Sequence, residues 1–157
     1  MKPVLKKIKK IFKEKGLSYE IDEELNLIYF RIFGADVPIL VEIRLQYDDL
    51  LFISAGLEFE IPQSFYSEVL DVINDINGSA LIATLFLNKR ESCGEVLAQS
   101  SLFTIDEKLD KEAFYRTLFS TIEIANSNST VIMEEVFDDD AIAKIREKKC
   151  AEESQNE

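Results

Sequence analysis

The chain has 157 residues, a length that suits one domain with a sizeable core, and 46% of them are hydrophobic. It contains no histidine, which removes the usual general base and the commonest transition-metal ligand. Its 30 acidic and 18 basic residues give a formal net charge of −12, which repels phosphate backbones. The composition therefore favours a globular domain that uses no histidine chemistry and binds no nucleic acid.

The N-terminal segment is basic although the chain is acidic. Residues 1–15 contain seven lysines and one acid, so they carry +6 while the rest carries −18. Pro3 suits a first helical turn, Gly16 suits a C-terminal cap, and one apolar stripe recurs at helical spacing: Val4, Leu5, Ile8, Ile11 and Phe12. Two interpretations remain open: the stripe packs within its own domain, or the basic amphipathic helix 2–15 lies on an anionic membrane surface.

Four strand patterns follow at short spacing. Residues 17–22, 37–47 and 51–59 alternate between apolar and more polar side chains, whereas residues 25–33 are apolar on both faces. Pro38 has no amide donor, so we expect its end of the strand to lie at an edge or a bulge. Four consecutive strands predict an antiparallel meander with one buried face.

A second helix is predicted to begin at Pro62 and to end at Asn77-Gly78. Its apolar arc spans about 160° at about 100° per residue, which is wider than one docking stripe needs. The arc consists of Phe65, Tyr66, Val69, Leu70, Val72, Ile73 and Ile76. Residues 81–87 and 95–103 then predict a hairpin around the polar stretch 88–94. Its outward apolar residues, on the face opposite Leu85 and Val96, are Ile82, Phe86, Leu97 and Phe103.

A long last helix is predicted after Asp110, which is a good N-cap. The polar run 126–130 (NSNST) competes with the helix through its own side chains. The apolar stripe resumes in the same phase after this run, so we predict one continuous helix weakened in its middle, with a break as the alternative. The predicted organisation is one domain over residues 1–137 and a charged C-terminal tail, partly helical or disordered, over residues 138–157.

No residues have the spacing of a catalytic, cofactor or metal site. Asp138, Asp139 and Asp140 lack the glycine turn and the distant glutamate of a calcium loop. Cys93 has no histidine to activate it, and it has no redox or metal spacing with Cys150. We therefore expect no enzyme activity, no cofactor, no metal and a cytoplasmic location with reduced thiols.

The order α-β-β-β-β-α-β-β-α resembles that of the YbjN-like family, which has the type III secretion chaperone-like fold. The resemblance covers about residues 3–137. It is carried by residues 69–77 (VLDVINDIN), a helix that ends with two asparagines three apart, by the hairpin segments 83–87 (ATLFL) and 96–102 (VLAQSSL), and by the long helix 112–135. The lysine-rich first helix and the tail after Phe137 depart from the family pattern. The resemblance implies a single α+β domain, an antiparallel sheet packed by helices, that acts as a dimer without enzyme activity.

The resemblance also implies a sensory-transduction regulator or a chaperone-like module. We therefore predict a homodimeric protein-binding module that holds a segment of a partner protein. The apolar arc and the four outward hairpin residues named above are its predicted dimer or partner surface, and an open sheet edge is a second predicted contact. A membrane-surface regulator anchored by helix 2–15 is the alternative function.

Overall fold

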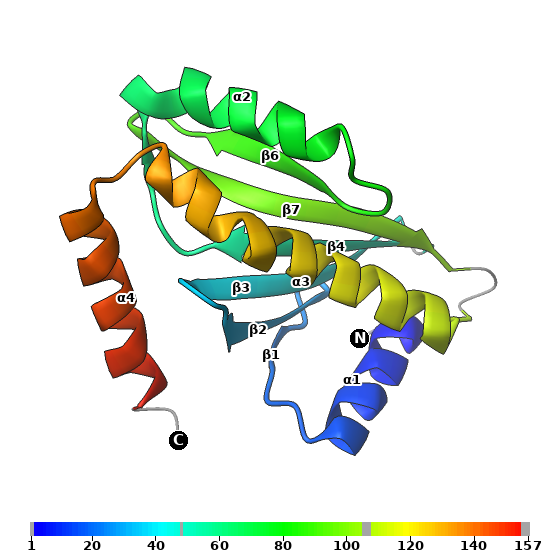
Figure 1. The fold of residues 1–157 in the computed structure, drawn as a ribbon. Helices are drawn as coiled ribbons and strands as arrows, with labels where there is room; N and C mark the ends of the chain where they lie inside the picture. Colours follow the sequence, from blue (N-terminus) through cyan, green and yellow to red (C-terminus); the bar gives the residue numbers. More distant parts are fainter. Residues whose placement is uncertain (1, 48, 105–107, 155–157) are drawn as a thin grey trace.

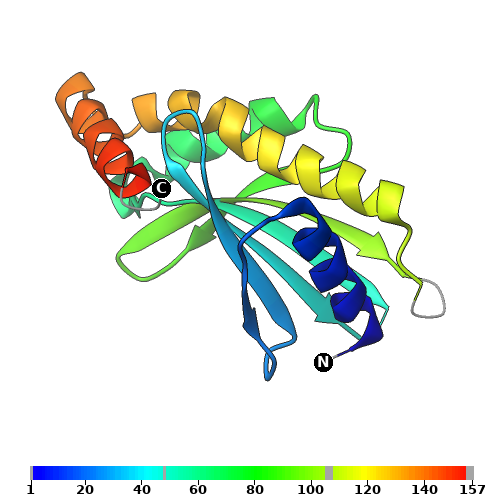
Figure 2. The same ribbon diagram turned by 90° about the horizontal axis from the view of Figure 1, so that it is seen from below.

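The computed structural model describes residues 2–47, 49–104 and 108–154 and confirms the predicted α+β architecture. One seven-stranded antiparallel sheet carries helices on one of its faces (Figures 1 and 2). The elements in chain order are α1 (Pro3–Lys15), β1 (Glu20–Asp22), β2 (Leu27–Phe33), β3 (Pro38–Gln46), β4 (Leu50–Leu57), β5 (Ile61–Pro62), the 3₁₀ turn η1 (Gln63–Phe65), α2 (Tyr66–Asn77), β6 (Thr84–Lys89), β7 (Cys93–Phe103), α3 (Lys111–Glu134) and α4 (Asp139–Glu153).

The strand order is β1-β2-β3-β4-β7-β5, and β6 pairs with the other side of β7. The predicted meander is therefore confirmed as β1–β4. The two-residue strand β5 is absent from the prediction: Ile61 is fully buried and pairs with Gly94, so Pro62 belongs to a strand and the second helix begins at Tyr66. The hairpin strand also begins later than predicted, at Thr84, which leaves residues 81–83 in the preceding loop.

Helix α1 is part of the core. Val4, Leu5, Ile8 and Phe12 are fully buried, and Gly16 ends the helix in the left-handed conformation that suits a residue without Cβ. The Phe12 ring lies 5.4 Å from that of Phe30 in β2 and 6.2 Å from that of Phe114 in α3, measured between centroids. The interpretation in which this helix packs within its own domain is confirmed.

Helix α3 crosses the sheet beside α2 and runs unbroken through the polar run 126–130, so the predicted continuous helix is confirmed (Figure 1). Asp110 caps its N-terminus, because its carboxylate accepts hydrogen bonds from two backbone amides of the first turn. A buried hydroxyl pair joins α3 to β7. The hydroxyl oxygens of Ser100 and Thr121 are 2.5 Å apart, and the Thr121 hydroxyl donates to the Thr117 carbonyl. Ser100 is therefore the donor to Thr121.

The tail is a helix. Asp138 caps α4, which extends to Glu153 and buries Ile142. Figure 1 shows α4 at one end of the sheet, beyond the C-terminal end of α3. Residues 155–157 of the predicted tail lie outside the described residues.

Candidate functional site

The strand register identifies the face of the sheet opposite the helix layer, here called the open face. Leu40 in β3 pairs with Gly56 in β4, Gly56 with Leu97 in β7, and Leu97 with Phe86 in β6. Because side chains alternate along a strand, these four residues form one row on the same face. Among the described residues, no helix crosses the middle of this face (Figure 2).

A groove of about 490 Å³ lies on the open face, here called the open-face groove. Its floor is the apolar row of Leu40, Gly56 and Leu97. Gly56 keeps this floor flat: a Cβ there would lie 2.8 Å from Cδ2 of Leu97, which extends over the glycine. The volume falls within the range of about 300–1,000 Å³ that is typical of ligand pockets.

Acidic side chains line the open-face groove. Glu42, Glu58, Glu60 and Glu95 contribute four carboxylates, and Arg90 contributes one cation. Arg90 forms a 2.7 Å ion pair with Glu95, and Glu58 accepts a 2.7 Å hydrogen bond from Arg31. Within residues 2–47, 49–104 and 108–154, neither Glu42 nor Glu60 forms an ion pair. The groove is therefore apolar at its floor and negative at its rim.

The free edge of β6 is closed at one position by a side chain. Asn77, the last residue of α2, donates to the Leu85 carbonyl and accepts from the Leu85 amide, both at 2.8 Å. The amide group thus occupies the position of a neighbouring strand. Addition of a partner strand at Leu85 is therefore blocked.

The predicted surface residues are divided among four environments. Val69 and Ile73 lie in the core with at most 2% exposure, so they are unavailable to a partner. The other five arc residues (Phe65, Tyr66, Leu70, Val72 and Ile76) are half-buried in the helix layer. Phe86, Leu97 and Phe103 lie on the open face as predicted, and Phe103 is 71% exposed. Ile82 is exposed but belongs to the loop before β6.

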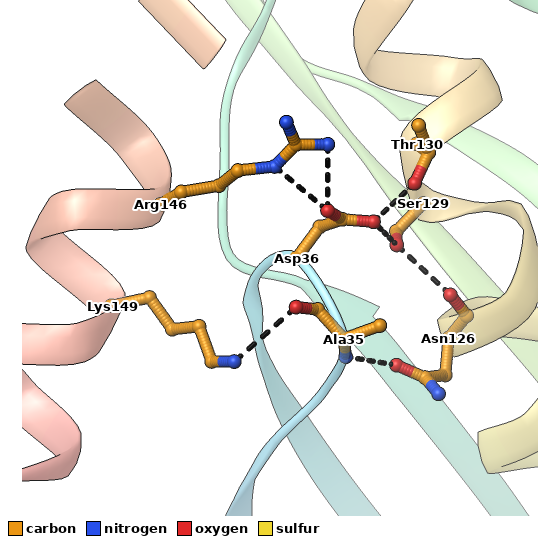
Figure 3. Close-up of polar contacts among 7 residues, drawn as sticks. All are labelled: Ala35, Asp36, Asn126, Ser129, Thr130, Arg146 and Lys149. Carbon is orange, nitrogen blue, oxygen red and sulfur yellow. Dashed lines mark hydrogen bonds and ion pairs between the residues drawn. The ribbon is translucent and has the colours of Figure 1, made fainter. Parts of the chain in front are cut away.

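A second polar site, which sequence reasoning missed, is the Asp36 cluster: Ala35, Asp36, Asn126, Ser129, Thr130, Arg146 and Lys149 (Figure 3). One Asp36 oxygen accepts hydrogen bonds from the hydroxyls of Thr130 and Ser129. The other oxygen lies 2.8 Å from both Nε and Nη2 of Arg146 in α4. The cluster therefore joins the β2–β3 turn to α3 and α4.

The polar run 126–130 of α3 is the sequence signal for this cluster. Asn126 accepts a 2.7 Å hydrogen bond from the Ala35 amide, and Lys149 donates to the Ala35 carbonyl at 3.3 Å. Ser127 and Asn128 donate to carbonyls one turn earlier, so their side chains are satisfied without ending the helix. A polar run inside an amphipathic helix can thus mark a docking position for a turn.

The environment of Asp36 favours its ionised form. Burial alone would raise the pKa of this carboxyl, but the Thr130 hydrogen bond, the Arg146 hydrogen bond and charge, and the Ser129 hydroxyl outweigh burial. The pKa of Asp36 is consequently held below its ordinary value. This carboxylate is structural, because its oxygens are engaged by side chains of the same chain.

Helix α4 borders the open face. Arg31 contacts both Glu58, at 2.7 Å, and Glu152 of α4, at 3.9 Å. Glu58 lines the open-face groove and also a smaller hollow of about 180 Å³ between α4 and the sheet. The aromatic rings of Phe59 and Phe137 meet edge to face at 5.8 Å in the same region.

The described residues contain no group of three or more His, Cys, Asp and Glu side chains that could hold a metal ion. Across the same residues, no helix combines the length and apolar content required to span a membrane.

Comparison with known proteins identifies the fold. No family model matches the sequence, and no curated protein matches it. Among solved structures, the chain is similar to YbjN of E. coli, described as "a putative transcription regulator": TM-score 0.61, 20% identity, covering 83% of this chain and 89% of YbjN. It is also similar to an uncharacterized protein from Methanothermobacter thermautotrophicus: TM-score 0.56, 15% identity, covering 85% of this chain and 99% of that protein. The chain therefore has the YbjN-like fold.

Proposed function

We propose that this chain is a non-enzymatic protein-binding module, of regulatory or chaperone-like type, which holds a segment of a partner protein on the open face of its sheet. The observation that carries the proposal is the asymmetry of the sheet. One face is covered by α1, α2 and α3, whereas the other bears a groove with an apolar floor. Solvent-facing sheet surfaces are usually polar at alternate positions, and apolar side chains gathered in a surface groove are typical of binding sites.

The similarity to YbjN is compatible with a regulatory role, since the E. coli protein is described as a putative transcription regulator. A net charge of −12 opposes direct contact with a phosphate backbone. We therefore propose that any regulation acts through protein contacts instead of direct DNA binding.

The alternative of a membrane anchor receives no support from the packing of α1. The apolar residues that would enter a membrane are buried in the core instead: Val4, Leu5, Ile8 and Phe12 are fully buried. The Phe12 ring also packs against Phe30 and Phe114. Membrane insertion would require α1 to leave the core and expose the cavity it fills.

Hydrogen exchange of the full chain with a partner recovered from its host tests the proposal. We expect added protection in β3, β4 and β7, the strands that form the groove floor. Protection confined to α2 and α3 would place the partner on the helix layer and refute an open-face site.

A further inference from the structure

The apolar floor of the open-face groove has acidic groups on both sides along the strand direction. Glu42 is the next residue on the open face after Leu40 in β3, and Glu95 is the preceding one before Leu97 in β7. Because β3 and β7 run in the same direction, these two carboxylates lie on opposite sides of the Leu40–Gly56–Leu97 row. Glu58 and Glu60 add to the Glu95 side through the connection between β4 and β5.

The lining of the groove is negative, and it stays negative when the two neighbouring open-face arginines are counted, Arg31 beside Leu40 and Arg44 two residues beyond Glu42. Four glutamates and one arginine line the groove, and the ion pairs of Glu58 and Glu95 leave Glu42 and Glu60 without a cationic partner among the described residues. An acidic or neutral segment would leave this potential uncompensated, whereas a basic segment would complement it.

Resting on the proposed function, we infer that the partner segment is basic, with a lysine or arginine on each side of an apolar residue, in the pattern basic-x-apolar-x-basic. An extended chain places every second side chain on one face, about 6.4–6.8 Å apart. Adjacent open-face rows of the sheet repeat at the same distance, because they are also two residues apart along each strand. A segment lying along the strands therefore seats its apolar residue over Gly56 and directs its flanking cations to Glu42 and to the Glu60–Glu95 side.

Fluorescence anisotropy of the full chain with labelled nine-residue peptides tests this inference. The probes have a Lys-x-Leu-x-Lys core, the same residues with both lysines placed side by side, or Glu-x-Leu-x-Glu, with x as serine. We expect the first probe to bind most tightly, and we expect its affinity to fall as the salt concentration rises. Equal binding of the two lysine probes would overturn the spacing, and equal binding of the glutamate probe would overturn the charge requirement.

Two matched variants separate a specific site from general attraction. E42Q/E60Q removes the two carboxylates without cationic partners, and E134Q/E135Q makes the same change in net charge at exposed positions near the end of α3. The first should weaken binding of the Lys-x-Leu-x-Lys probe about two- to thirtyfold, from about 0.2–1 kcal/mol per exposed charge pair, and the second should leave it unchanged. Equal loss in both variants overturns the inference.

Leu97→Ala should weaken binding of the Lys-x-Leu-x-Lys probe, because the apolar contact is lost. Equal melting temperatures of this variant and the unmodified protein would exclude unfolding as the cause. Spermidine that displaces the probe at equal charge concentration would instead identify the groove as a site for small polycations.

The inference and the proposed function can also fail separately. Open-face protection by a host partner whose bound segment is acidic or neutral would refute the basic pattern and leave the proposed function in place.

Discussion

Replacement of Phe12 by alanine tests whether the lysine-rich helix is a structural part of the domain. The Phe12 side chain is fully buried, and its ring contacts those of Tyr19, Phe30 and Phe114 at 5.4–6.2 Å between centroids. Truncation of a buried phenylalanine to alanine costs about 3–5 kcal/mol through lost burial and the cavity that remains. A domain of this size has a free energy of unfolding of about 5–15 kcal/mol, so the substitution should remove a large share of it.

Urea unfolding followed by circular dichroism measures this loss, and Lys13→Ala on the exposed face of α1 is the matched control. At about 2–4 °C per kcal/mol for a domain of this length, Phe12→Ala should lower Tm by about 6–20 °C. Lys13→Ala should change the free energy of unfolding by about 0.5 kcal/mol or less. A loss below about 1 kcal/mol for Phe12→Ala would show that α1 does not pack as described and would revive the membrane alternative.

Three further predictions concern the Asp36 cluster, the β6 edge and self-association. Because the folded-state pKa of Asp36 is lowered, its stabilising contribution is present above the ordinary aspartate pKa of about 3.9 and is lost as pH falls through the folded value. Asp36→Asn should therefore destabilise the protein at pH 7 and reduce the dependence of its stability on pH below 4; an unchanged pH profile in urea titrations would contradict this. Asn77→Ala leaves the Leu85 amide and carbonyl without their side-chain partner and should cost about 1–3 kcal/mol in the same titrations, whereas a neutral result would argue against the capped edge. The chain should form a dimer through its helix-covered side, where Phe119 of α3 is 61% exposed and Leu81, in the loop between α2 and β6, is 98% exposed. Light scattering should therefore give a dimer mass that falls toward the monomer mass in Leu81→Ser; a monomer at tens of micromolar would refute it.

The order and type of the main elements could be predicted because local signals agreed with tertiary packing. The strand of Pro38–Gln46 alternates without error, and its odd-numbered residues from Ile39 to Leu45 are buried. Helix α1 has a start signal, an end signal and a stripe of the correct period, and each corresponds to the structure. The expectation for Pro38 was wrong: β3 is an inner strand between β2 and β4, and Pro38 continues the register opposite Phe33 without a bulge. The proline is accommodated because it is the first residue of the strand, where a missing amide donor costs least.

The features that could not be predicted depend on contacts between distant segments. β5 has only two residues, and it is a strand because Ile61 and Pro62 meet Gly94 and Cys93 of β7. The buried Ser100–Thr121 pair likewise depends on the packing of α3 against β7. A two-residue run or a single hydroxyl has no periodic pattern for sequence reasoning to detect.

The candidate site could be predicted only in part. Alternation along the hairpin placed Phe86, Leu97 and Phe103 correctly on one face, because their positions depend on local period alone. The groove also needs Leu40 and Gly56, which are more than 40 residues away from Leu97 and meet it only through the register of three strands. The width of the α2 arc did not reveal that Val69 and Ile73 form its buried centre.

Photo-crosslinking inside the host cell tests the open-face site most directly. A benzophenone side chain at Phe86 samples the open face, and the same group at Phe119 samples the exposed side of α3. We expect the group at position 86 to cross-link to a basic segment of a partner protein, and the group at position 119 to cross-link to a second copy of this chain. A partner cross-linked from Phe119 and not from Phe86 would contradict binding on the open face.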